Sequence, residues 1–199
     1  MLKFIAFVLL CNSFLFSQLR LGLDISGDVK VAWQSVSDLD GSSDTYAPDK
    51  GIIIGYDYLT KEQDQLHLGI GGEYMIGREA EESHGKLSFH SIYGFGKYAI
   101  DDKLYGLARL GYNIHTGDDE YRESIPLDGG STTLKHTGGM MYSFGGGYSL
   151  TPNINIEALH SSHAGKSTFS GSAVEALLGD DLVMKINYTR LTVAIVYTK

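Results

Sequence analysis

Eight stretches that alternate apolar residues with small or polar ones follow one another between residue 18 and the C-terminus. Alternation with a period of two is typical of β-strands whose two faces meet different environments. The seven connections between these stretches are alternately long and short, and all three prolines fall within connections. Because proline cannot donate to a strand ladder, this placement fits strands that are paired on both sides. The chain is therefore predicted to form an antiparallel sheet of eight strands.

The long connections are predicted at residues 35–50, 77–86, 116–136 and 164–182. Barrels that insert into a membrane from one side keep short turns on that side and carry long loops on the far side. An even number of strands returns the C-terminus to the side of the N-terminus. Since the bilayer core holds no water, a closed barrel is needed to leave no strand edge unpaired. We therefore predict an all-β fold, an eight-stranded antiparallel up-and-down transmembrane β-barrel, with these four loops outside the cell.

The N-terminal segment has a different composition from the rest of the chain. Lys3 is followed by an apolar run at residues 4–10 and by small or polar residues, which is typical of a secretory signal. We predict a signal peptide at residues 1–17 and an outer-membrane β-barrel domain at residues 18–199. A buried first strand or helix is the alternative. The single cysteine, Cys11, lies in this segment, so the mature chain is expected to have neither a disulfide nor a thiolate metal site.

The charge of the chain argues against nucleic acid as a partner. The sequence has 24 acidic and 16 basic residues, a formal net charge of −8. Binding to a phosphate backbone requires clustered lysine and arginine. No metal-ligand spacing and no cofactor motif is found, so no metal and no cofactor are expected.

The two faces of the predicted strands differ, and two barrels could share this pattern. One face carries Leu, Ile, Phe and Tyr, and the other carries Gly, Ser, Asn and isolated charges. A soluble, lipocalin-like barrel would put the apolar face inside, whereas a membrane barrel puts it outside. The interior of eight strands has room for side chains only, which favours the glycine-rich face inside. Predicted interfacial aromatics are Trp33, Tyr58, Tyr74, Tyr112, Tyr148 and Tyr197.

The alternation also gives specific predictions for three of the stretches. In the first stretch, Val29, Val31 and Trp33 are assigned to the outer face. In the fourth stretch, the outer face receives Leu87, Phe89, Tyr93 and Phe95. In the last stretch, a phase slip at Thr189–Arg190 predicts a β-bulge.

Charged side chains on the predicted inner face form a candidate site. They are Arg20, Asp24, Glu73, His90, Arg109, Glu157 and Arg190. Charges enclosed in a narrow barrel must pair, because unpaired charges would pay a prohibitive desolvation cost. We expect a polar network that plugs the lumen, and a small-solute pore is the alternative.

Three segments resemble the small eight-stranded outer-membrane barrels of Gram-negative bacteria, of the OmpA-like and opacity-like type. They are residues 105–113, 145–153 and 191–197. Such barrels usually end on an aromatic residue, whereas this chain ends Tyr197-Thr198-Lys199. The resemblance implies a monomeric protein of the cell outer membrane in contact with its lipids and lipopolysaccharide. It also implies a role in envelope integrity or in surface interaction, in which the acidic loops could meet external ligands.

A second resemblance concerns catalysis. The segment 160–165, His-Ser-Ser-His-Ala-Gly, is similar to the His-x-Ser-Asn-x-Gly segment of the outer-membrane lipid A deacylases. It implies Ser162 as nucleophile, His160 as base and Glu175 as the orienting carboxylate. His163 stands where those enzymes have asparagine, and Glu175 falls in a predicted loop. The alternative is that a strand becomes a polar surface loop here, and the predicted protein is then not an enzyme.

Overall fold

The structure is a computed structural model of the chain. It describes residues 17–34, 43–79, 86–117, 133–172, 174–175, 179 and 181–199. The predicted signal at residues 1–17 lies outside the described residues, except for Ser17, which begins the first strand. The described residues contain the strands β1 (Ser17–Gln34), β2 (Ser43–Tyr46), β3 (Ile52–Gln63), β4 (Leu66–Met75), β5 (Arg78–Glu79), β6 (Lys86–Ala99), β7 (Leu104–Gly117), β8 (Thr133–Thr151), β9 (Ile154–Ser170) and β10 (Leu182–Thr198).

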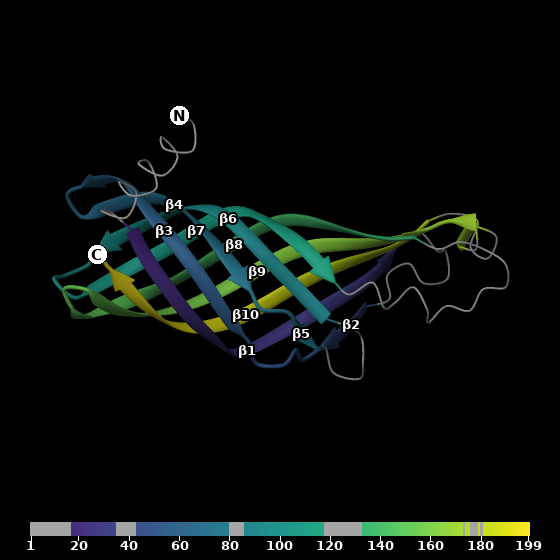
Figure 1. The fold of residues 1–199 in the computed structure, drawn as a ribbon, viewed down its shortest axis with the longest axis horizontal. Helices are drawn as coiled ribbons and strands as arrows, with labels where there is room; N and C mark the ends of the chain where they lie inside the picture. The colour runs from purple at the N-terminus through teal and green to yellow at the C-terminus, as the bar shows by residue number, and fades with distance from the viewer. Residues whose placement is uncertain are drawn as a thin grey trace, which may run out of the picture.

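Eight of these strands form a closed antiparallel ring in chain order. The order is β1, β3, β4, β6, β7, β8, β9 and β10, and β10 pairs with β1 to close the ring (Figure 1). The short strands β2 and β5 pair with β1 and β6. This ring confirms the eight-stranded up-and-down topology predicted from the sequence. Among the described residues, no helix is long and apolar enough to cross a membrane.

The short turns and the C-terminus lie at one end of the ring, as expected for the periplasmic end. The Lys199 amide donates to the Ser17 carbonyl at 3.3 Å, so the last residue closes beside the first strand residue. In the turn between β6 and β7, the Asp101 carboxylate accepts hydrogen bonds from the backbone amides of Lys103 and Leu104 at 2.8 and 2.7 Å. These bonds favour the charged carboxylate and lower the pKa of Asp101.

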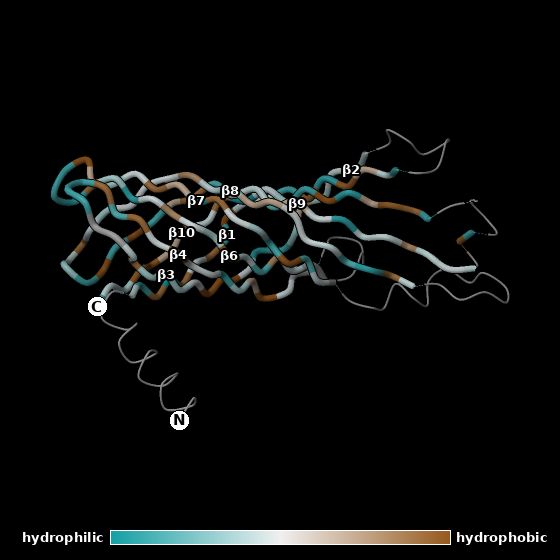
Figure 2. The backbone as a smooth tube through the Cα atoms, turned by 90° about the horizontal axis from the view of Figure 1, so that it is seen from above, coloured by the Kyte–Doolittle hydropathy of each residue, from teal (hydrophilic) through white to brown (hydrophobic). Residues whose placement is uncertain are grey.

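Large apolar side chains cover the outside of the half of the ring nearer these turns. Ile70 and Leu110 are each 60% exposed, whereas Arg20 and Glu157 on the inner face are fully buried. Figure 2 shows hydrophobic colours recurring along the strands of this half. An apolar exterior with charges enclosed is the arrangement of a barrel in lipid, not of a soluble one. We call this outward-facing surface the apolar belt.

The arrangement is reversed in the half nearer the long connections, where β8, β9 and β10 continue past the rest of the ring (Figure 1). We call this part the stem, and it comprises residues 27–34 of β1, 133–138 of β8, 163–170 of β9 and 182–188 of β10. The apolar side chains packed inside it are Val29, Val31, Trp33, Leu134, Phe169, Met184, Ile186 and Tyr188. Buried apolar groups under a polar outer face fit water outside, so the stem projects beyond the bilayer.

A β-bulge in β1 connects the two halves. The register with β10 shifts between Asp24 and Ser26. One extra residue moves all following side chains to the opposite face. Val29, Val31 and Trp33 therefore point inward, and their predicted outward placement is wrong.

The bulge predicted in the last strand is also wrong. β10 alternates without interruption through Thr189–Arg190, with Arg190 and Thr192 buried on the same face as Tyr188 and Ile186. The chemistry of the inner face changes along this strand from polar to apolar. If apolar residues are assumed to lie on the outer face along the whole strand, this change looks like a one-residue shift in the alternation, which is what a bulge would produce.

The two faces of β6 are the reverse of those predicted. Phe89, Tyr93 and Phe95 point into the barrel, and His90 points outward, where its ring stacks on Tyr74 at 4.4 Å. The inner face of β6 also carries the buried polar side chains of Ser91 and Lys97. Glycines on neighbouring strands leave the space that these inward aromatic rings need.

Two predicted loops are shorter than expected because the strands of the stem extend into them. β8 begins at Thr133 within the predicted loop 116–136, and β9 continues to Ser170 within the predicted loop 164–182. Residues 35–42, 80–85, 118–132, 173, 176–178 and 180 of the predicted loops lie outside the described residues.

Glycine on the inner face should be far less replaceable than glycine on the outer face. At Gly71, a Cβ atom would lie 2.6 Å from Tyr93 Cε2, whereas at Gly94 the nearest atom is 3.8 Å away. We expect Gly71→Val to lower the free energy of unfolding by about 1–3 kcal/mol through overpacking. The matched variant Gly94→Val should leave it unchanged or raise it slightly, because valine favours strands. Urea titration of the chain folded in lipid vesicles measures both, and equal losses would contradict the assignment of faces.

Candidate functional site

The centre of the lumen is occupied by Arg20 of β1. Its Nη1 donates to Asp57 Oδ2 at 2.9 Å, and its Nη2 donates to Glu73 Oε2 at 3.2 Å and to Tyr93 Oη at 2.5 Å. The Tyr93 hydroxyl in turn donates to Asp57 Oδ1 at 2.6 Å. Gly55 on β3 makes room for the guanidinium, because a Cβ atom there would lie 2.7 Å from Arg20 Cζ. One arginine thus joins β1 to β3, β4 and β6 across the barrel.

A second cluster forms around Glu157 of β9, on the side of the short turns. Its carboxylate accepts hydrogen bonds from Lys97 at 2.8 Å, Arg109 at 3.0 Å and the Tyr105 hydroxyl at 3.0 Å. Lys97 also donates to the side chain of Gln18. Arg109 lies 3.6 Å from Asp57 and so connects this cluster to the central one.

A third cluster completes the network toward the stem. The Asp24 carboxylate accepts from Arg190 at 3.3 Å, from Thr192 at 2.5 Å and from Tyr188 at 3.2 Å. Arg190 also forms an ion pair with Glu73. Glu73 therefore bridges the central arginine and the third cluster.

The charges of this network balance. Within the described residues it contains four carboxylates and four cations: Asp24, Asp57, Glu73, Glu157, Arg20, Lys97, Arg109 and Arg190. All eight residues are buried, and they come from seven of the eight ring strands. Buried charges need partners of opposite sign and hydrogen bonds to offset desolvation. The network supplies both, and its side chains reach across the lumen from seven strands.

A layer of aromatic rings and histidines lies above the network, at the base of the stem. Phe89 stacks on His115 at 4.6 Å, and its centroid lies 5.8 Å from that of His163 and 5.9 Å from that of Tyr188. His136 meets His115 edge to face at 4.8 Å. In the described part of the chain, no group of three or more His, Cys, Asp or Glu is arranged as metal ligands would be.

Six of the seven predicted lumen residues meet in this network, and one does not. Arg20, Asp24, Glu73, Arg109, Glu157 and Arg190 lie together in the lumen. The predicted placement of His90 in the lumen is wrong, because His90 lies on the outer face of β6. Asp57, Lys97 and Tyr93 were not predicted. Asp57 could have been found from its parity, since it alternates with the outward-facing Tyr56 and Tyr58 on β3.

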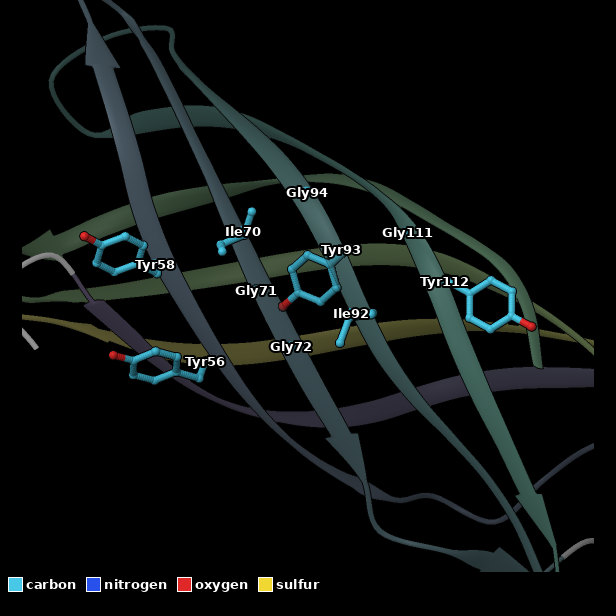
Figure 3. Close-up of a pocket in the computed structure, with 10 residues that line it drawn as sticks. All are labelled: Tyr56, Tyr58, Ile70, Gly71, Gly72, Ile92, Tyr93, Gly94, Gly111 and Tyr112. Atoms are coloured by element: carbon cyan, nitrogen blue, oxygen red, sulfur yellow. The ribbon is translucent and has the colours of Figure 1, made fainter. Parts of the chain in front are cut away.

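The described part of the ring has hollows, of which one opens at the short-turn end and another lies on the outer surface. A vestibule of about 410 Å³ opens at the short-turn end and reaches Lys97, beside Gln18 and Asn155. A groove of about 670 Å³ lies across β3, β4, β6 and β7, with its apolar lining including Ile70 and Ile92 (Figure 3). The residues that line the groove include tyrosines but no carboxylate, histidine, lysine, serine or cysteine.

The candidate catalytic residues do not form a triad. His160 and Ser162 share the outer face of β9, and the His160 ring packs against Phe144 at 5.3 Å. The Ser162 hydroxyl donates to Asn187 Oδ1 at 3.0 Å rather than to a histidine. Glu175 lies beyond the end of β9. The eight strand residues after Ser162 alone span about 26 Å, at about 3.3 Å per residue.

No family model matches the sequence, and no curated protein matches it. Solved outer-membrane proteins share the fold. The crystal structure of the outer membrane protein OprG from Pseudomonas aeruginosa has a TM-score of 0.53 at 11% identity, covering 94% of this chain and 99% of that one. The solid-state NMR structure of the outer membrane protein AlkL in DMPC bilayers has a TM-score of 0.54 at 11% identity, covering 92% and 90%. Neisserial surface protein A has a TM-score of 0.49 at 15% identity, covering 92% and 97%.

These likenesses concern the fold, and the features of the chain itself agree with them. The ring is closed, its belt is apolar, and its lumen is polar and charged. The chain is therefore a small integral β-barrel of the outer-membrane type, as its sequence predicted.

The network should respond more strongly to the loss of one partner than to the loss of a pair. We expect Glu157→Gln to lower the free energy of unfolding by about 3–5 kcal/mol, because two cations lose their carboxylate. Adding Lys97→Met removes one of these cations and should restore part of the loss. Unfolding by urea in vesicles measures each variant, with Asp102→Asn in an exposed turn as a control within about 0.5 kcal/mol of wild type. If the double variant were less stable than Glu157→Gln, the coupling described here would be wrong.

Proposed function

We propose that the protein is a non-enzymatic, non-conducting outer-membrane barrel that supports the envelope and presents its stem and loops at the cell surface. The single observation that carries the proposal is the balanced network of four carboxylates and four cations across the lumen. A conducting pore needs a continuous water path, and this network replaces that path with direct ion pairs. The aromatic and histidine layer adds a second barrier above it.

Three features support the surface role: the extra length of the stem strands, the long connections at that end, and the negative net charge of the chain. The stem is built from four strands that continue past the belt, which is more than a plugged anchor requires. The connections at this end are long, and the chain is acidic as a whole. In this proposal the partners are outer-membrane lipids, including lipopolysaccharide, and external ligands that meet the loops.

Conductance tests whether the lumen is closed. We expect the folded wild-type chain in a planar lipid bilayer to give no sustained current steps at moderate voltage. The variant Arg109→Ala with Glu157→Ala removes two side chains that cross the lumen and should produce steps. The outward variant His90→Ala serves as the control and should remain silent, and heat-modifiable gel migration verifies that each variant is folded. Regular steps from the wild-type chain would overturn the closed-barrel proposal.

Lipid A analysis tests the esterase alternative. Among the described residues, the Ser162 hydroxyl bonds Asn187 rather than a histidine, and Glu175 lies beyond the end of β9, so we expect no deacylation. Cells that express the wild type, Ser162→Ala or no protein should give identical lipid A masses. Loss of an acyl chain with the wild type but not with Ser162→Ala would show that the protein is an enzyme.

A further inference from the structure

The outer face of the stem carries a row of four exposed lysines on four adjacent strands: Lys135 of β8, Lys166 of β9, Lys185 of β10 and Lys30 of β1. Lys166 and Lys185 are directly opposite each other in the ladder between β9 and β10. Lys135 is one diagonal step from Lys166, since Thr137 pairs with Lys166 and Lys135 pairs with Thr168. Lys30 is likewise diagonal to Lys185. We call these four residues the lysine row.

The lysine row is electrostatically unfavourable by itself. Side chains directly opposite in an antiparallel pair have Cβ atoms about 5 Å apart, and diagonal neighbours are about 7–8 Å apart. Like charges at these positions repel one another. Among the described residues, none of the four lysines has an ion pair with an acid. Charges in the lumen are paired because burial removes their hydration, whereas the four lysines of the row are exposed and their charges face the surroundings of the stem.

The outward neighbours of the row are mostly uncharged. They are Thr137, Thr168, Asn187 and Thr45, with Asp28 two residues below Lys30. Threonine and asparagine can donate hydrogen bonds to oxygen atoms without repelling an anion. The surface thus offers positive charge and neutral donors over about three strand spacings.

A surface with positive charge and neutral donors is suited to an anion. The position of the lysine row above the apolar belt indicates where that anion comes from. Met140, 62% exposed, is the last large apolar side chain on the outer face of β8 before the stem, and Ala164 lies beside it on β9. Lys166 follows Ala164 by two residues, which is about 7 Å along the strand and less in height because barrel strands are tilted. Polar headgroups add about 5–8 Å to each side of the hydrocarbon core. The row therefore begins at the headgroup level.

The net charge of the chain argues for a local lipid rather than a distant soluble anion. At −8, the molecule repels soluble polyanions at long range. A lipid anchored in the same leaflet is already beside the row, and basic residues near a membrane surface attract anionic headgroups.

We propose that the lysine row is a binding site for the phosphate groups of a lipopolysaccharide-type lipid in the outer leaflet. The pair Lys166–Lys185 holds one phosphate, and Lys135 and Lys30 extend the site to both sides for a second. This site lies outside the barrel, so its occupancy does not depend on whether the lumen conducts.

A titration with labelled lipopolysaccharide tests the site. The full-length folded chain in neutral detergent is titrated and followed by fluorescence anisotropy. Each lysine near an anionic surface contributes about fivefold in affinity, so Lys166→Gln with Lys185→Gln should bind about 25-fold more weakly. The matched control, Lys103→Gln with Lys199→Gln, removes the same charge at the short-turn end and should bind within about twofold of wild type. Lys166→Arg with Lys185→Arg should retain binding.

Further probes identify the group that is bound. Dephosphorylated lipopolysaccharide should bind the wild type about as weakly as the intact lipid binds the glutamine variant. Without lipid, the glutamine variant should melt at a higher temperature than wild type, because the facing like charges are gone. Equal affinity of wild type and the glutamine variant overturns the proposal, and so does an equal loss in the control pair. Soluble short-chain polyphosphate that binds as tightly as lipopolysaccharide overturns the lipid as the source.

Discussion

Closure of the ring by β1 and β10 is the constraint on which the rest of the structure depends. In hydrocarbon an unpaired backbone amide or carbonyl is costly, so the first and last strands must pair. They do so along nearly their full lengths, from Gln18 opposite Thr198 to Gln34 opposite Val183. Eight closed strands in turn fix a narrow lumen, because barrel diameter follows strand number. A narrow lumen excludes bulk water, so every charge in it needs a partner within the protein.

In the lumen, large side chains that carry the ion pairs lie opposite glycines, which leave space for them. Arg20 and Tyr93 reach across the barrel, and Gly55 and Gly71 give them the space. Glycine in a strand loses favourable side-chain packing and conformational preference. That loss is tolerated here because each missing side chain admits a group that connects several strands. The glycine content of the sequence and the charge network are therefore two parts of one arrangement.

The sequence predicted the topology well and the faces only in part. In an up-and-down barrel each strand pairs with the next one along the chain. The alternation of long and short connections was therefore enough to predict which strands pair. The network was largely predictable, since Arg20, Asp24 and Glu157 alternate with obviously apolar neighbours. Alternation does not state which face is inside, and in β6 the aromatic residues Phe89 and Phe95 suggested the wrong one.

The stem explains the other errors. Along β1 and β10 the surroundings change from lipid to water, so the face that must be apolar changes within one strand. A single rule for a whole strand cannot describe this change. The failure of the predicted triad has the same origin, because the extension of β9 to Ser170 separates Glu175 from Ser162. Where the membrane ends is a property of the folded barrel in its bilayer, and no local pattern records it.

The stem also sets how far the molecule reaches. The eight residues of β9 beyond Ser162 span about 26 Å along the strand, or about 20 Å in height for strands tilted by about 40°. Because the interior of the stem is packed with apolar side chains, the stem is a rigid extension of the barrel and not a flexible linker. The end of β9 at Ser170 is thereby carried beyond the headgroup layer, which adds about 5–8 Å to each side of the hydrocarbon core. A macromolecule or particle that approaches the cell, such as an antibody or a phage, would contact the end of the stem before it could contact the barrel wall.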